Sequence, residues 1–261
     1  MRSFYTVWRF HQQGTACCIS TIESASAIGE SSSHCGEMNA MNQEQWTAVD
    51  RYIAETVVPS DAALDAAVEA STKAELPAIA VTPNQGKLLQ IYARLVNSRR
   101  ILEIGTLGGY STIWLARALP EDGQLISLEL NPKHAEVARG SIERAGLSKK
   151  VEIRIGRALD ALPKLASEGK GPFDLIFIDA DKASIPEYFD WSLRLSRPGS
   201  VIIVDNVVRK GAVVEADSRD QDVQGVRRLN EMLTNERRVT ATTIQTVGSK
   251  GYDGFTVALV N

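Results

Sequence analysis

The sequence lacks the features that mark several large classes of protein. Its three cysteines, Cys17, Cys18 and Cys35, all precede Met41. The rest of the chain therefore offers neither a disulfide framework nor a catalytic thiol, as suits a reducing cytoplasm. No apolar run approaches the roughly 20 residues of a membrane span. A net charge of −3 leaves no basic surplus for nucleic acid. We expect a cytoplasmic protein with neither a nucleic acid nor a membrane as its partner.

Residues 1–40 differ in character from the rest of the chain. They are rich in Ser, Gly and Ala, and no helical or strand period is sustained in them. We predict that this segment is a disordered N-terminal extension. A second hypothesis is that Met41 is the true start of the protein, because the composition changes there.

Residues 41–261 are predicted to form a single α/β domain. Residues 41–99 have a helical pattern, with apolar residues three or four apart from Trp46 onward. From Arg100 the chain alternates between short apolar strands and amphipathic helices, which predicts a sheet core over residues 100–261, mostly parallel and with helices on both faces. The last two strands are joined by a glycine-rich turn and are expected to pair as an antiparallel hairpin. The predicted strands are residues 100–104, 124–128, 151–155, 173–178, 200–204, 239–247 and 255–260.

The chain is organised around residues 101–111. They begin as a buried strand, break at Gly105, Gly108 and Gly109, and continue as a helix, which is the arrangement of a nucleotide-type site in an open α/β sheet. The order of glycines is not G-x-G-x-x-G, which disfavours a dinucleotide. Glu103 beside the turn would repel a diphosphate and favour a cationic ligand end, such as that of S-adenosylmethionine. Glu103 could instead be a structural carboxylate that accepts hydrogen bonds from nearby backbone amides.

Further polar residues follow the carboxyl ends of other predicted strands. Glu129 stands 24 residues after Gly105, close to the spacing expected of a carboxylate that binds a ribose diol. Asp179, Asp205 and Asn206 end the fourth and fifth strands and form an oxygen-only set. Such a set suits Mg²⁺ or another divalent cation, such as Mn²⁺ or Ca²⁺. Any one of these acids alone is more often a solvated or capping group, but several at one edge of a sheet would face one crevice.

Two basic residues lie near these acids in the sequence. Lys182 follows Asp179 by three positions. A bound cation would disfavour its ammonium form and make it a usable base, although a lysine in a loop is more often just solvated. His134 falls in the predicted helix 132–145, and we interpret it as an ordinary surface histidine away from the strand ends.

From about Gln43 to the C-terminus, the chain resembles the cation-dependent O-methyltransferases, which include the caffeoyl-CoA and catechol enzymes. The resemblance implies a class I S-adenosylmethionine-dependent methyltransferase of Rossmann-like fold, with a seven-stranded, mostly parallel sheet, and it implies a homodimer. In place of the His-Trp pair of animal catechol enzymes the chain has Ala180-Asp181, which favours the caffeoyl-CoA-like, bacterial-type branch. The resemblance rests on four segments in the same order and with similar spacing, LEIGTLGGYS (102–111), ISLE (126–129), FIDADK (177–182) and IVDN (203–206).

The resemblance also implies roles for individual residues. Asp179 and Lys182 match catalytic positions, with Lys182 as the base, and the metal ligands would be Asp179, Asp205 and Asn206. The positions that match cofactor contacts are Val81, Glu103, Gly105, Thr106, Ser111, Glu129, Ala158 and Asp181, of which Glu129 matches the ribose-binding acid.

We therefore expect an S-adenosylmethionine- and metal-dependent O-methyltransferase whose acceptor is a small vicinal-dihydroxy aromatic molecule, catechol-like or caffeoyl-type. One alternative is an NAD-type Rossmann oxidoreductase, and another is a methyltransferase-fold binding protein without activity. The loop 207–221 carries Arg209, Lys210 and Arg219, which could meet a charged acceptor or simply be solvated.

Overall fold

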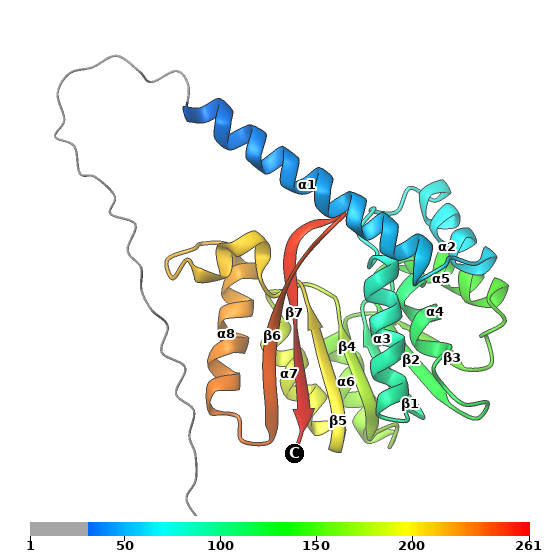
Figure 1. Ribbon diagram of the computed structural model, residues 1–261. Helices are drawn as coiled ribbons and strands as arrows, with labels where there is room; N and C mark the ends of the chain where they lie inside the picture. Colours follow the sequence, from blue (N-terminus) through cyan, green and yellow to red (C-terminus); the bar gives the residue numbers. More distant parts are fainter. Residues whose placement is uncertain (1–30) are drawn as a thin grey trace, which may run out of the picture. The chain divides into compact units, whose positions relative to one another are not determined.

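A computed structural model describes residues 31–261 of the chain (Figure 1). Residues 40–261 form one compact unit, and the residues before them are assigned to another. Helix α1 extends over Ser31–Thr56, so residues 31–40, which the sequence pattern did not predict as helical, are part of this helix. The rest of the predicted disordered extension, residues 1–30, lies outside the described residues.

Two more helices precede the sheet, and a side-chain cap fixes the start of each. Helix α2 (Ala62–Lys73) begins after Asp61, and helix α3 (Pro83–Leu95) begins after Thr82. Both cap residues accept hydrogen bonds from backbone N–H groups of the first turn, which have no partner within the helix. Because the Thr82 hydroxyl accepts from Gln85 N at 3.2 Å, the cap of α3 also fixes the position of Gln85.

The strands form one seven-stranded sheet in the order β3-β2-β1-β4-β5-β7-β6. The pairs among β1 to β5 are parallel, whereas β7 is antiparallel to both β5 and β6. The predicted mostly parallel sheet with a closing antiparallel hairpin is therefore confirmed. The bounds are β1 Arg100–Ile104, β2 Gln124–Glu129, β3 Val151–Ile155, β4 Phe173–Ile178, β5 Ser196–Asp205, β6 Val239–Gly248 and β7 Gly251–Val260.

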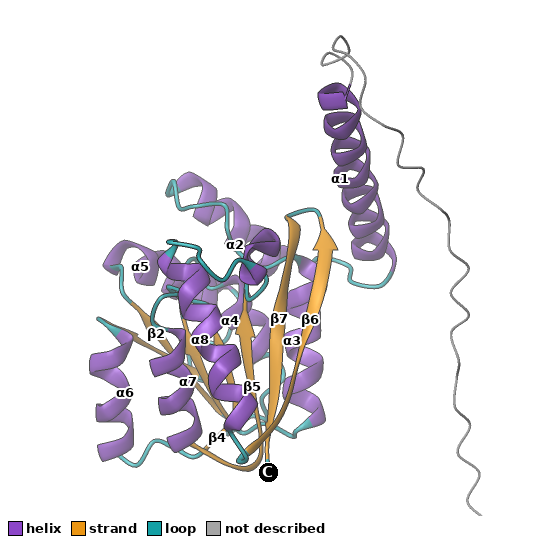
Figure 2. Cartoon of the chain, turned by 90° about the vertical axis from the view of Figure 1, so that its left-hand side faces the viewer, coloured by secondary structure: helices purple, strands orange, loops and turns teal. Residues whose placement is uncertain are grey.

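Helices cover both faces of the sheet because the strands are apolar on both sides. Successive side chains of a strand point to opposite faces. Thus Ile101 of β1 belongs to the core under α3, α4 and α5, whereas Leu102 belongs to the core under α6, α7 and α8 (Figure 2).

Within the described part of the chain, no helix is long and apolar enough to cross a membrane. The remaining helices are α4 Tyr110–Ala116, α5 Pro132–Arg144, α6 Ala158–Ser167, α7 Ile185–Arg194, the 3-10 helix η1 Arg209–Val214 and α8 Gln221–Asn235.

The strand order reverses next to β1, which lies between β2 and β4. In an open α/β sheet a crevice forms at such a switch point, outside the carboxyl ends of the strands. The register aligns Ile104 with Leu128 and with Ile178, and Ile178 with Val204. The residues that follow these four positions therefore come to one edge of the sheet, namely Gly105, Glu129, Asp179 and Asp205.

Candidate active site

A cavity of about 1000 Å³ opens at this edge. A smaller one of about 280 Å³ lies between the start of α3 and the β6–β7 hairpin, and Val81 and Asn206 line both. Asp205 lines only the smaller cavity, and Glu103 lines neither. The other predicted site residues that line the larger cavity are Gly105, Thr106, Ser111, Glu129, Ala158, Asp179, Asp181 and Lys182.

The glycine turn after β1 is possible only with glycine at its first position. Gly105 has a φ of +101°, and a Cβ there would lie 2.1 Å from the carbonyl oxygen of Asp179. The turn and the end of β4 therefore touch through their backbones. Glu129 holds the same turn from the other side, because its Oε2 accepts from Thr106 N at 3.1 Å and from Leu107 N at 2.9 Å.

Glu103 lies behind the turn and is fully buried. Its carboxylate accepts three hydroxyl hydrogen bonds, from Ser111 at 2.6 Å, Thr112 at 2.5 Å and Ser127 at 2.6 Å. Burial nevertheless raises the pKa of Glu103 to about 7. The structural partners of Glu103 are thus hydroxyl groups, and not the backbone amides that a structural role predicted from the sequence. Direct contact of Glu103 with a cofactor stays a prediction.

The raised pKa of Glu103 predicts a pH-dependent stability. Its neutral form is favoured in the folded protein, so this group's contribution to stability is fully present below its ordinary pKa and is lost as the pH rises through about 7. Between about pH 5 and about pH 8, the wild type should lose roughly 2 to 3 kcal/mol more unfolding free energy than Glu103→Gln. Urea unfolding of both proteins at the two pH values measures this. Parallel losses would contradict the assignment.

Asp181 is held by a residue that the sequence analysis did not identify. Its Oδ1 accepts from the Tyr188 hydroxyl at 2.5 Å, and its Oδ2 accepts from Ser184 N at 3.1 Å. Partial removal from water opposes ionisation, but these hydrogen bonds outweigh that effect and lower the pKa of Asp181. Tyr188 also lines the larger cavity. The sequence does contain a signal for this contact, because Tyr188 stands in the first turn of the helix that follows the acids at the end of β4.

His134 was interpreted wrongly from the sequence. Its side chain is only 19% exposed, it lines the larger cavity, and its Nδ1 lies 3.5 Å from Oε1 of Glu129. The reason is local: α5 begins almost directly after β2, so the first turn of α5 stays beside the strand end. The short connection between Glu129 and Pro132 could have revealed this.

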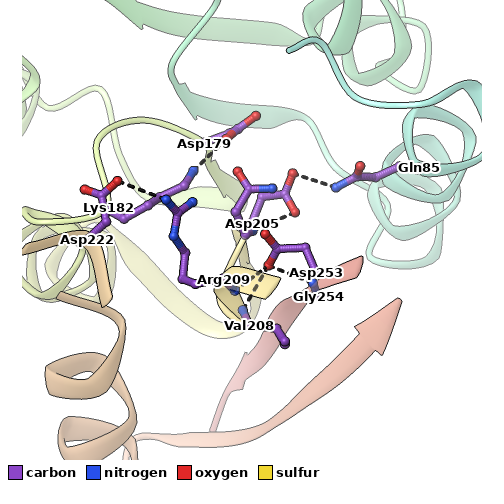
Figure 3. Close-up of polar contacts among 10 residues, drawn as sticks. Gln85, Asp179, Lys182, Asp205, Val208, Arg209, Asp222, Asp253 and Gly254 are labelled. Atoms are coloured by element: carbon purple, nitrogen blue, oxygen red, sulfur yellow. Dashed lines mark hydrogen bonds and ion pairs between the residues drawn. The ribbon is translucent and has the colours of Figure 1, made fainter. Parts of the chain in front are cut away.

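The acids at the ends of β4 and β5 lie together with a buried lysine (Figure 3). Lys182 Nζ donates to Asp179 Oδ1 at 2.7 Å, and the Lys182 residue is 5% exposed. Asp205 Oδ2 accepts from Gln85 Nε2 of α3 at 2.7 Å. Burial, and secondly the negative charge of Asp179, raise the pKa of Asp205 above its usual range. The structure thus brings Asp179, Lys182 and Asp205 to one place, as the strand-end argument predicted.

The loop that follows these acids is fixed by β7. Oδ1 of Asp253 accepts from Val208 N at 2.9 Å, Arg209 N at 3.0 Å and Gly254 N at 2.9 Å (Figure 3). Asn206 and Arg209 both adopt left-handed backbone conformations, with φ of +56° and +55°. These conformations cost free energy in residues other than glycine, so the two hydrogen bonds from Val208 N and Arg209 N to Asp253 help to maintain them.

No group of three or more His, Cys, Asp or Glu side chains that could hold a metal ion occurs in the part of the chain that the structure describes. The predicted ligand set has two carboxylates and one amide, so it is not a group of that kind.

Comparison with known proteins identifies the family. The family model described as O-methyltransferase matches residues 54–259. The chain belongs to this O-methyltransferase family. The catechol O-methyltransferase of Niastella koreensis is 54% identical over 220 residues, covering 84% of this chain and 100% of that protein.

Two solved structures of O-methyltransferases are similar over most of their length. TomG from Streptomyces achromogenes, involved in tomaymycin synthesis and in complex with S-adenosylmethionine, is 56% identical with a TM-score of 0.83, covering 85% of this chain and 99% of that one. An O-methyltransferase from Bacillus cereus, in complex with S-adenosylhomocysteine, is 54% identical with a TM-score of 0.83, covering 84% and 100%.

These findings confirm the family and the Rossmann-like methyltransferase fold that the four motifs predicted. The protein is an O-methyltransferase, and the alternative of an NAD-type oxidoreductase is wrong. The Niastella relative carries the name catechol O-methyltransferase. The caffeoyl-CoA-like branch, which Ala180-Asp181 favoured, therefore stays a prediction.

Proposed function

We propose that this O-methyltransferase transfers the methyl group of S-adenosylmethionine to one hydroxyl of a vicinal-dihydroxy aromatic acceptor, with the help of a divalent cation. The observation that carries the proposal is that Asp179, Lys182 and Asn206 line the cavity whose other wall is the glycine turn, with Asp205 beside them in the adjoining smaller cavity. A methyl donor on the turn and a diol at the acids would then face each other.

The cofactor part of the proposal is supported by the β1–β2 side of the larger cavity. Glu129 Oε2 accepts two backbone N–H groups, and Oε1 accepts one from Asn131 at 2.9 Å. A carboxylate can accept about four hydrogen bonds, so Glu129 can still take a ribose hydroxyl. S-adenosylmethionine and S-adenosylhomocysteine are the ligands of the Streptomyces and Bacillus relatives.

The acids at the β4–β5 side fit a divalent cation. Asp179, Asp205 and Asn206 offer only oxygen atoms, which Mg²⁺, Mn²⁺ and Ca²⁺ prefer. Asp205 is 5% exposed, and the negative charge of Asp179 adds to the effect of burial on its pKa. A positive charge between the two carboxylates would relieve this repulsion, which Lys182 relieves only in part. When bound, such an ion would make the acceptor hydroxyl more acidic.

Lys182 is proposed as the base. Its Nζ is buried at the cavity edge. As an ammonium it has no lone pair, so it must first release a proton to solvent, which a neighbouring divalent cation would favour; the neutral amine then takes the proton of the acceptor hydroxyl. The hydroxyl oxygen forms the new bond to the methyl carbon, and the bond from that carbon to the sulfonium sulfur breaks, which leaves S-adenosylhomocysteine. The residues that line the cavity accelerate the transfer mainly by positioning the methyl donor and the acceptor.

Removal of divalent cations is expected to abolish turnover. In EDTA, methylation of catechol should fall by about a hundredfold or more, because the two carboxylates would lose the ion that helps ionise the acceptor. Added Mg²⁺ should restore the rate, and calorimetric affinity for S-adenosylhomocysteine should persist in EDTA. Full turnover in EDTA would remove the cation from the proposal.

An acceptor screen tests the proposal as a whole. Dihydroxy aromatics should give a singly methylated product by mass spectrometry, whereas matched monohydroxy compounds should not. Tight cofactor binding without product from any acceptor would instead favour a protein that has lost its activity.

A further inference from the structure

The cavity carries a guanidinium group on the side away from the proposed cofactor site. Arg209 is the first residue of η1, which follows β5 after a short connection, and it lines the larger cavity together with Lys182 and Asn206. Along the sheet edge, the order β2-β1-β4-β5 puts Glu129 at one end and the end of β5 at the other. If the cofactor binds at β1 and β2, Arg209 lies beside the acceptor.

The guanidinium of Arg209 has donors to spare. Nη2 donates to Asp222 Oδ2 of α8 at 3.2 Å, while Nε is shielded from water and has no acceptor among the described residues (Figure 3). A buried donor without a partner costs about 1 to 3 kcal/mol. Since water cannot reach Nε, a ligand oxygen cannot reach it in this conformation either. The donors open to a ligand are Nη1, for which no hydrogen bond occurs among the described residues, and the second hydrogen of Nη2.

The backbone of Arg209 is also in a costly state. Its φ is +55°, and its N–H is held by Asp253 at 3.0 Å. Strained conformations that a surrounding structure maintains cluster at binding and catalytic sites. Arg209 therefore carries two separate free-energy costs, the buried Nε without an acceptor and the left-handed backbone conformation.

The two lysines that line the same cavity have their ammonium groups engaged. Lys182 Nζ donates to Asp179 at 2.7 Å. Lys250 Nζ donates to the carbonyl oxygens of Ala78 and Ala80. On the β4–β5 side, Arg209 is thus the cation with free directional donors among the described residues that line the cavity.

We propose that Arg209 is a specificity-determining residue that binds a carboxylate on the ring of the acceptor, an inference that rests on the proposed function. A guanidinium matches a carboxylate with two parallel hydrogen bonds, which makes it selective for a planar anion. Asp222 holds the guanidinium toward the cavity before the acceptor arrives. The substrate class becomes dihydroxy aromatic acids.

The test compares two acceptors that differ in one charge, 3,4-dihydroxybenzoate and 3,4-dihydroxybenzamide. In Arg209→Gln, the ratio of kcat/KM for the acid to that for the amide should fall about tenfold or more, mainly through KM for the acid. The same ratio in Arg209→Lys should lie between those of the wild type and Arg209→Gln. The matched control is Lys210→Gln, which removes the same charge at an exposed residue that lines neither cavity, and its ratio should stay within about twofold of the wild type.

Binding provides a second measurement. Calorimetric titration of 3,4-dihydroxybenzoate into the S-adenosylhomocysteine complex with Mg²⁺ should show the same loss of affinity in Arg209→Gln. An equal loss for both acceptors, or no change in the ratio, would overturn the role of Arg209 while leaving the proposed function intact. If the wild type methylated catechol but neither of these two acceptors, the proposal for Arg209 would be overturned, whereas no product from catechol either would count against the proposed function itself.

Discussion

Replacement of Lys182 by methionine should lower kcat by about 10²- to 10⁴-fold, the range typical of removing a general base. The affinity for S-adenosylhomocysteine should stay within a few-fold, because the ammonium group contacts Asp179 and not the glycine turn. Methionine is similar in length and apolar, which suits a residue that is 5% exposed. Turnover by mass spectrometry and calorimetry with S-adenosylhomocysteine measure the two effects.

The variant Lys182→Arg distinguishes a role of this residue in proton transfer from a role of its positive charge alone. Arginine keeps the positive charge beside Asp179 but cannot be deprotonated in a protein. We therefore expect it to be nearly as impaired as the methionine variant. A near wild-type rate in Lys182→Arg would show that the group acts only through its charge, and the role of base would have to be given up.

Gly105→Ala is expected to damage the fold and the site together. An alanine would have to adopt a φ of +101° and would place its Cβ 2.1 Å from the carbonyl oxygen of Asp179. Both the strained backbone and the forced separation of β1 and β4 cost free energy, and together they should lower the unfolding free energy by roughly 3 kcal/mol or more. Because Asp179 must move, turnover and cofactor affinity should both fall.

Gly140→Ala in α5 is the matched control. Its Cβ would meet only the end of the Arg144 side chain, at 3.3 Å, and alanine favours a helix by up to about 1 kcal/mol over glycine. Urea unfolding should thus give opposite signs for the two variants. Equal stabilities would mean that the turn after β1 can relax, and that the close contact with β4 is not required.

The strand-end residues could be predicted from the sequence because a parallel sheet brings all its carboxyl ends to one edge. Each of Glu129, Asp179 and Asp205 follows a recognisable apolar run, so knowing the strands was enough to place the acids. The hairpin was predictable for a similar reason, since its turn residues lie between two β-rich runs.

Contacts made by helices across the sheet edge could not be predicted in this way. Gln85 donates to Asp205 across 120 residues of sequence, because the Thr82 cap starts α3 near the end of β5. Asp253 holds the amides of Val208 and Arg209 from a strand whose position in the sheet was not evident in its sequence. Such partners depend on the angle and height at which elements pack, which periodicity does not encode.

The position of β7 has a consequence for how the enzyme matures. β7 is the last element in chain order, yet it lies between β5 and β6. During synthesis, the glycine turn and Glu129 can find each other long before Asp253 has been made. Asp253 can bind the two backbone amides of the loop with Arg209 only afterwards. A nascent chain should therefore acquire the ability to hold the methyl donor first and the ability to discriminate among acceptors last.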